Sequence, residues 1–253
     1  MSTKTSTPTS GPARNKATVP IVVAVVAALI TGVMLLAPAL AGGGGNESEA
    51  PVAGVSRDGS RPPVAGESDP FAALVRRDAD DPMALGEVDA PVVMINYSEF
   101  QCPFCGKFAR DTKPELVQKY VEDGTLRIEW RDFPYLGPES TTAAQAGRAA
   151  GAQGKFWEFH DAMFADQQPP NSGKLTEEYL VGVAKEAGLD AEQFAKDLKS
   201  DAVAAAVQKD FQEGQSIGVT GTPAFLVNGQ PIMGAQPTEV FAEAIEQAAE
   251  AAR

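Results

Sequence analysis

Both cysteines of the 253-residue chain lie in one segment, Glu99-Phe100-Gln101-Cys102-Pro103-Phe104-Cys105-Gly106-Lys107. Apolar residues dominate the run 92–97 that precedes it, which is typical of a buried strand. After it, apolar residues recur at helical spacing. The pattern therefore predicts a strand that leads into a helix whose first turn carries a Cys-x-x-Cys pair.

This placement gives the two thiols different chemistry. Residues three apart lie on one face of a helix, and their Cα atoms then sit roughly 5–6 Å apart, within the range of a disulfide. A sulfur at the helix start faces unpaired backbone N–H groups and the positive end of the dipole, which stabilise the reactive thiolate. Pro103 suits the first helical position, where no N–H is needed. We predict Cys102 as the nucleophile, Cys105 as the more buried resolving thiol, and a redox-active Cys102–Cys105 disulfide.

Three other interpretations of the pair stay open. A purely structural disulfide would gain little from so short a loop. Half of a zinc site would need two more ligands, and the chain offers one histidine, His160, and no further cysteine. Two inert core cysteines fit poorly with Pro103 between them and with their polar neighbours. The sequence therefore implies neither a metal nor an organic cofactor.

The N-terminal part of the chain predicts a membrane anchor. Residues 19–41 carry no charged side chain, and more than 20 apolar residues can cross a hydrocarbon core of about 30 Å. Lys4, Arg14 and Lys16 precede this run, which favours a cytoplasmic N-terminus and an external domain. Alternatively, cleavage after Ala39-Leu40-Ala41 would release the domain as a secreted protein.

The remaining organisation follows from composition and periodicity. We predict a cytoplasmic tail at 1–18, a transmembrane signal anchor at 19–41, a disordered linker at 42–70 and a folded domain at 71–253. Within the domain we expect strands at 83–86, 92–100 and 125–131, a helix at 102–122 that Pro114 kinks or splits, and an all-helical insertion at about 140–217. An Asn228-Gly229 hairpin and a final helix that Thr238 caps and that ends at Ala251 should follow.

The charge of the chain restricts its partners. The formal net charge is −13, and the three basic residues before the anchor are the only charges before Glu47, so the rest carries −16. This acidity argues against a nucleic-acid partner.

Two motifs more than a hundred residues apart resemble the DsbA-like branch of the thioredoxin superfamily. They are Ser98-Glu99-Phe100-Gln101-Cys102-Pro103-Phe104-Cys105 and Gly218-Val219-Thr220-Gly221-Thr222-Pro223-Ala224-Phe225. Between them, Phe156-Trp157-Glu158-Phe159-His160-Asp161 is similar to part of a helix common in this branch. The resemblance covers about 85–251 and implies a thioredoxin-like mixed sheet with an inserted helical subdomain. It also implies that Pro223 is cis and lies beside the cysteines, which would leave the backbone of Thr222 free to pair with an incoming peptide.

The chain departs from this family at two positions. Several relatives carry histidine where this chain has Phe104, and often a buried acid where it has Asn96. Glu99 is the nearest carboxylate in sequence and is our candidate for proton transfer. His160 and the aromatic residues around it are expected to pack in the core.

The resemblance implies an extracytoplasmic thiol–disulfide oxidoreductase that donates disulfides to exported proteins with free thiols. With no cofactor motif in the chain, reoxidation would need a membrane protein of the DsbB or vitamin K epoxide reductase-like kind. A disulfide reductase or isomerase with the same pair is the alternative, and a non-redox peptide-binding or chaperone module is a third interpretation.

Overall fold

The computed structural model describes residues 70–253. The predictions for 1–18, for 19–41 and for all but the last residue of 42–70 lie outside this range. Among the described residues, no helix combines the length and the apolar character that crossing a bilayer requires.

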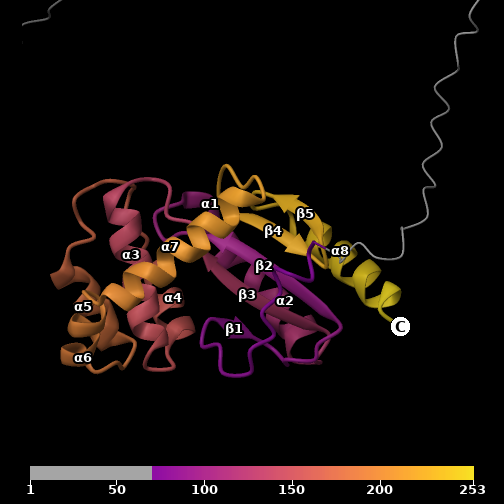
Figure 1. Cartoon of the computed structure of the whole chain (residues 1–253), viewed down its shortest axis with the longest axis horizontal. Coiled ribbons are helices and arrows are strands. Elements are labelled where there is room, and N and C mark those ends of the chain that lie inside the picture. Colours follow the sequence, from indigo (N-terminus) through magenta and orange to yellow (C-terminus); the bar gives the residue numbers. More distant parts are fainter. Residues whose placement is uncertain (1–69) are drawn as a thin grey trace, which may run out of the picture. The chain divides into compact units, whose positions relative to one another are not determined.

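A five-stranded mixed sheet forms the centre of the described domain (Figure 1). Its order is β1-β3-β2-β4-β5, so β2 is the middle strand, parallel to β3 and antiparallel to β4. The strands are β1 (Ala84–Leu85), β2 (Val92–Ser98), β3 (Leu126–Asp132), β4 (Ala224–Val227) and β5 (Gln230–Met233). The prediction of a mixed sheet around residues 92–98 is confirmed, although β2 ends two residues earlier than expected.

Strand β2 is buried on both faces, as its sequence predicted. Val92 and Met94 pack in one hydrophobic cluster with residues of α8 (Thr238–Ala251), whereas Val93, Ile95 and Tyr97 pack in another on the opposite face. Alternate side chains of a strand point to opposite faces, so a continuous apolar run fits a strand with both faces covered.

The helix after the cysteine motif is divided into four short segments. These are α1 (Pro103–Lys107), a π-helical turn η1 (Phe108–Thr112), α2 (Lys113–Leu116) and a second π-helical turn η2 (Val117–Val121). Pro114 lies in the first turn of α2, and the N–H of Lys113 donates to the carbonyl of Phe108, five residues earlier. The predicted interruption is therefore present, as a change of helical winding.

The helical insertion is confirmed. It comprises α3 (Pro138–Gly151), α4 (Phe156–Ala165), α5 (Glu177–Glu186), α6 (Ala191–Asp197) and α7 (Asp201–Ser216). Figure 1 shows α3 to α6 beyond one side of the sheet and α7 running back toward the strands. Phe156, Phe159 and Phe164 are at most 1% exposed in the core of this subdomain, and His160 is buried among them, as expected.

The predicted hairpin is present between β4 and β5. Asn228 and Gly229 adopt φ values of 43° and 87°, the left-handed conformations that a tight hairpin turn requires. The final helix differs slightly from the prediction: Pro237 occupies the N-cap position, and Thr238, which we expected there, is the first helical residue.

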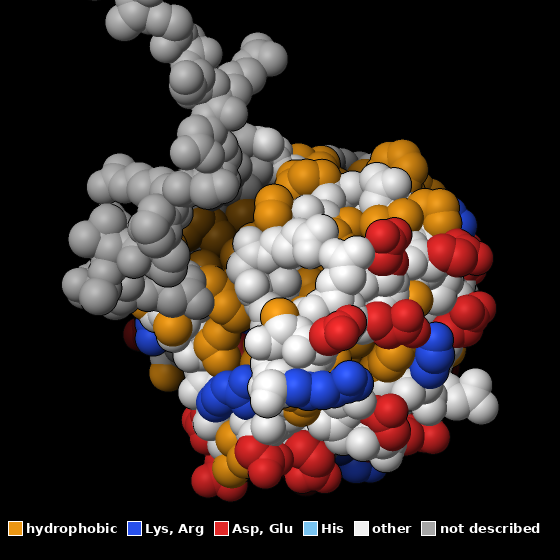
Figure 2. Space-filling view, turned by 90° about the vertical axis from the view of Figure 1, so that its right-hand side faces the viewer, with side chains coloured by type: hydrophobic (Ala, Val, Ile, Leu, Met, Phe, Trp, Pro, Cys, Tyr) orange, Lys and Arg blue, Asp and Glu red, His pale blue; other side chains and the backbone are white. Residues whose placement is uncertain are grey.

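Acidic side chains are spread over the surface. On the face shown in Figure 2 they follow the right and lower margins, and a row of basic side chains lies between them. This distribution agrees with the net charge of the sequence.

Candidate active site

Cys102 lies at the junction of sheet and helix. It is the N-cap residue of α1, and Pro103 is the first helical residue, as predicted. The Cys102 carbonyl accepts the N–H of Gly106 at 3.1 Å, which closes the first turn of the helix. This geometry leaves the N–H groups of Phe104 and Cys105 available to the Cys102 sulfur.

The two thiols are reduced and differ in acidity. A hydrogen bond from Cys105, helped by the N–H groups of Cys105 and Phe104, lowers the pKa of Cys102 to about 6, against the opposing effect of burial. Burial, together with the neighbouring Cys102, raises the pKa of Cys105 well above its usual value. The two residues are 2% and 1% exposed, so the expected difference in burial is small. Hydrogen bonding makes Cys102 the acidic thiol.

The loop before β4 covers the sulfur of Cys102. The Thr222–Pro223 peptide bond is cis, as the resemblance implied. The Cys102 thiol donates to the Thr222 carbonyl at 3.2 Å. A thiolate or a disulfide has no proton to donate, so either form would release this carbonyl for a peptide substrate. Thr222 and Pro223 are thus brought to the cysteines although 120 residues separate Thr222 from Cys102.

Glu99 is buried next to this centre, with 1% of its surface exposed. Its carboxylate accepts a hydrogen bond from the hydroxyl of Ser140, at the start of α3. Burial raises the pKa of Glu99 to about 7, and the charge of Cys102 acts in the same direction. Glu99 can therefore exchange a proton near neutral pH, whereas Asn96, which is also buried, cannot.

Aromatic side chains border the site. Phe104, between the two cysteines, is 63% exposed and supplies no charge. Tyr135 is 42% exposed, and its pKa is raised first by burial and then by the charge of Cys102. Tyr135 was not among the residues predicted from the sequence. It follows β3, and parallel strands β2 and β3 end at the same edge of the sheet, so its position could have been inferred from that pairing.

Polar groups of the insertion also contact the site, and they were not among the residues predicted from the sequence. Gln101 donates to the Ser140 hydroxyl at 2.8 Å and accepts the N–H of Asn171 at 2.7 Å. The side-chain amide of Gln167, just after α4, donates to the carbonyls of Phe100 and Cys102, both at 2.9 Å. No local sequence pattern signals these residues, because their partners depend on how the insertion packs on the sheet.

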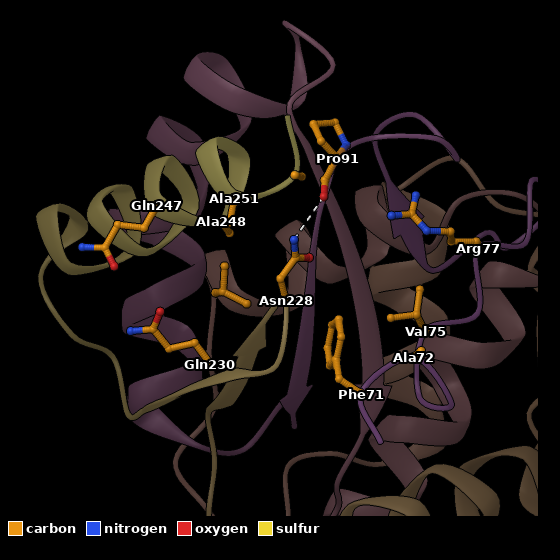
Figure 3. A pocket seen from close by; sticks show the side chains of 12 residues that line it. Phe71, Ala72, Val75, Arg77, Pro91, Asn228, Gln230, Gln247, Ala248 and Ala251 are labelled. Atoms are coloured by element: carbon orange, nitrogen blue, oxygen red, sulfur yellow. Dashed lines mark hydrogen bonds between the residues drawn. The ribbon is translucent and has the colours of Figure 1, made fainter. Parts of the chain in front are cut away.

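A cavity of about 620 Å³ lies at the opposite edge of the sheet and is separate from the cysteines. Figure 3 shows Asn228 at its centre, with the side-chain amide bonded to the carbonyl of Pro91 at 3.1 Å. Phe71 and Val75 line its other side. Because Pro91 precedes β2 and Cys102 follows it, the length of this strand separates the cavity from the active site.

Comparison with known proteins places these features in context. A family model described as "Thioredoxin" matches residues 78–247. The probable disulfide bond formation protein D of Bacillus anthracis is 35% identical over 150 residues, which cover 58% of this chain and 69% of that protein.

Solved structures give the same picture. Oxidised BdbD from Bacillus subtilis superimposes with a TM-score of 0.63 at 25% identity, covering 68% of this chain and 94% of that one. A thioredoxin-like oxidoreductase from Silicibacter pomeroyi DSS-3 superimposes with a TM-score of 0.59 at 31% identity, with coverage of 68% and 94%.

Proposed function

Because the chain belongs to the DsbA-like branch of the thioredoxin superfamily and is a thiol–disulfide oxidoreductase, we propose that it donates disulfides to exported proteins. The observation that supports this direction is the acidity of Cys102, whose pKa is lowered to about 6. A stabilised thiolate favours the reduced form of the pair, so the oxidised form is a better disulfide donor.

The proposed reaction starts from the Cys102–Cys105 disulfide. A substrate thiolate attacks the sulfur of Cys102, the bond to Cys105 breaks, and Cys105 leaves with the electron pair. A second substrate thiolate then attacks the substrate sulfur of the mixed disulfide, and Cys102 leaves as a thiolate. The substrate loses two electrons and gains a disulfide, and the pair gains the same two electrons.

Proton transfer is the role we assign to Glu99. The departing Cys105 thiolate needs a proton, because its burial disfavours the charged form. A carboxyl with a pKa of about 7 beside the pair can supply a proton and recover it from solvent or substrate. Thr222 and Pro223 would hold the substrate as an extended strand, and the exposed ring of Phe104 would contact its apolar side chains.

We place this reaction outside the plasma membrane, with the domain held by an anchor at 19–41, or secreted if cleavage occurs near Ala41. The pair must be reoxidised after each cycle, and we assign that step to a membrane protein of the DsbB or vitamin K epoxide reductase-like kind. The uncharged run 19–41 and the similarity to disulfide bond formation protein D support this assignment.

The test is the redox state of the pair in living cells. Acid quenching followed by thiol labelling should show mainly the oxidised Cys102–Cys105 form, and the purified oxidised protein should refold a reduced secreted substrate. A mainly reduced pair, with efficient reduction of insulin, would instead support a reductase or isomerase. Absence of both activities in the wild-type protein would support the non-redox module.

A further inference from the structure

The insertion contacts the backbone of the turn that carries Cys102 through the side chain of Gln167. Gln167 follows the C-terminal end of α4, and its amide nitrogen donates to the carbonyls of Phe100 and Cys102 at 2.9 Å each. These carbonyls belong to the residues on either side of Gln101, where the chain turns from β2 into α1. We propose that Gln167 is a positioning residue, which holds this turn so that the Cys102 sulfur faces the Thr222 carbonyl and the N–H groups of α1.

The orientation of the amide is determined by a second contact. Arg110, in η1, donates to the carbonyl of Phe164 at 2.7 Å and lies 3.4 Å from the amide oxygen of Gln167. The guanidinium is a donor only, so the amide oxygen faces Arg110 and the amide nitrogen faces the two carbonyls.

Gly106 makes this approach possible. A Cβ atom at position 106 would lie 2.1 Å from the amide oxygen of Gln167 and 2.7 Å from a nitrogen of Arg110. Gly106 lies inside α1, where it has no positive φ that would require glycine. Glycine is less favourable than alanine inside a helix, so its presence here is explained by the space that Gln167 occupies.

The consequence for chemistry follows from the Cys102 carbonyl. It accepts one hydrogen bond from the N–H of Gly106 and one from the side-chain amide of Gln167. These two hydrogen bonds restrain the backbone of Cys102. Because the N–H groups of Phe104 and Cys105 stabilise the thiolate only when they point at the sulfur, a looser turn weakens that stabilisation. This inference rests on the proposed role of Cys102 as nucleophile.

The test compares Gln167→Leu with Gln168→Leu in the full chain. Gln168 is a matched control, because within residues 70–253 its amide donates to Asp166 and Tyr179 and not to the turn that carries Cys102. We expect the alkylation profile of Cys102 in Gln167→Leu to move to higher pH, with a roughly threefold slower rate at mildly acidic pH, because the rate follows the thiolate fraction. The glutathione equilibrium should move toward a less oxidising pair, and Gln168→Leu should match the wild type in both measurements.

A double variant provides an independent check. Gly106→Ala should displace the amide and shift the profile in the same direction. In a Gln167→Ala background, Gly106→Ala should cause no further shift, since only the flexible end of Arg110 remains in the way. If Gln167→Leu does not fold, Gln167→Asn carries the test, because it keeps the amide on a shorter side chain that cannot reach both carbonyls.

An unchanged Cys102 profile in a folded Gln167→Leu or Gln167→Asn variant would overturn the inference, as would additive effects in the double variant. Failure of the underlying assignment gives a different result. If Cys105 is alkylated before Cys102 in the wild type, the assignment of Cys102 as the nucleophile is wrong. That result does not depend on Gln167.

Discussion

At the scale of single residues, the active site depends on two thiols with opposite acidity. Cys102 and Cys105 are almost equally buried, yet hydrogen bonding lowers the pKa of one while burial raises the pKa of the other. The site therefore concentrates nucleophilic character on the sulfur that faces the Thr222 carbonyl and leaves the second thiol to close the disulfide.

The division of roles predicts different outcomes for two serine variants. Cys102→Ser should abolish oxidoreductase activity, because no acidic thiol remains. Cys105→Ser should retain a reactive Cys102 and accumulate mixed disulfides with substrates, since no internal thiol can release them. Non-reducing gels and mass spectrometry of the trapped adducts would locate the bond. Adducts through Cys105 in a Cys102→Ser variant would reverse the assignment.

The lowered pKa of Cys102 predicts how stability depends on pH. The thiol titrates at about 6 in the folded reduced protein and at about 8.5 when unfolded. A depressed pKa contributes stability above the unfolded value, and that stability is lost as the pH falls through the folded value. The free energy of unfolding of the reduced form, relative to the oxidised form, should therefore rise between about pH 6 and about pH 8.5.

Denaturant titrations of both redox forms across this pH range would measure the difference. Cys105 does not alter the trend in this window, because its pKa is raised and both folded and unfolded forms stay protonated below the unfolded value. The raised pKa of Glu99 is caused first by burial, which both redox forms share, so that effect cancels in the difference. The Cys102→Ser variant is the control, and its stability should lack the corresponding rise. A difference between the redox forms that stays constant with pH would contradict the assignment of the acidic thiol.

At the scale of elements, β3 is buried on both faces although its sequence alternates apolar and charged residues. Its alternation of apolar and charged residues predicted a strand, and such a strand commonly has one face in water. The structure buries both faces, and Arg131 and Glu129 form an ion pair at 2.8 Å with neither side chain exposed. Arg131 also pairs with Glu213 of α7, so the returning helix of the insertion neutralises the charged face.

The hairpin at Asn228 gives a prediction at this scale. The Asn228 side chain accepts the N–H of Val93 at 2.8 Å and donates to the carbonyl of Pro91 at 3.1 Å, which ties the hairpin to the start of β2. Asn228→Ala would leave these groups unpaired and place alanine at a φ of 43°, so we expect a loss of about 1–3 kcal/mol in stability. Denaturant unfolding would measure it.

Activity provides the control for this variant. The hairpin lies at the opposite end of β2 from Cys102, so the alkylation profile of the folded Asn228→Ala protein should match the wild type. A stability within about 0.5 kcal/mol of the wild type, the usual range for surface substitutions away from such features, would contradict the role of the side chain.

At the scale of the whole molecule, the proposed anchor predicts where the domain resides. Protease added to intact cells stripped of their wall should remove the folded domain, because residues 19–41 would hold it outside with the N-terminus inside. Immunoblotting against the domain would report the cleavage, and a cytoplasmic protein would serve as the control. Protection of the domain would contradict the topology, and a mature N-terminus at Gly42 would indicate a secreted protein.

Features that depend on neighbours along the chain were predictable from the amino-acid sequence. Cys102 at the N-cap, Pro103 at the first helical position, the interruption at Pro114 and the turn at Asn228 follow from local steric and hydrogen-bonding preferences. The succession of helical patterns at about 140–217 likewise predicted an insertion, which the structure shows as α3 to α7.

The groups that meet at the Cys102 sulfur from distant parts of the chain depend on how the elements pack. Thr222 was found through family resemblance, but the contact between its carbonyl and the Cys102 thiol depends on the pairing of β4 with β2. Gln167 and Ser140 reach the site because α3 and α4 pack against the end of the sheet. Sequence periodicity does not indicate which distant group a polar side chain will bind. Its pKa and its hydrogen bonds depend on the burial that packing imposes.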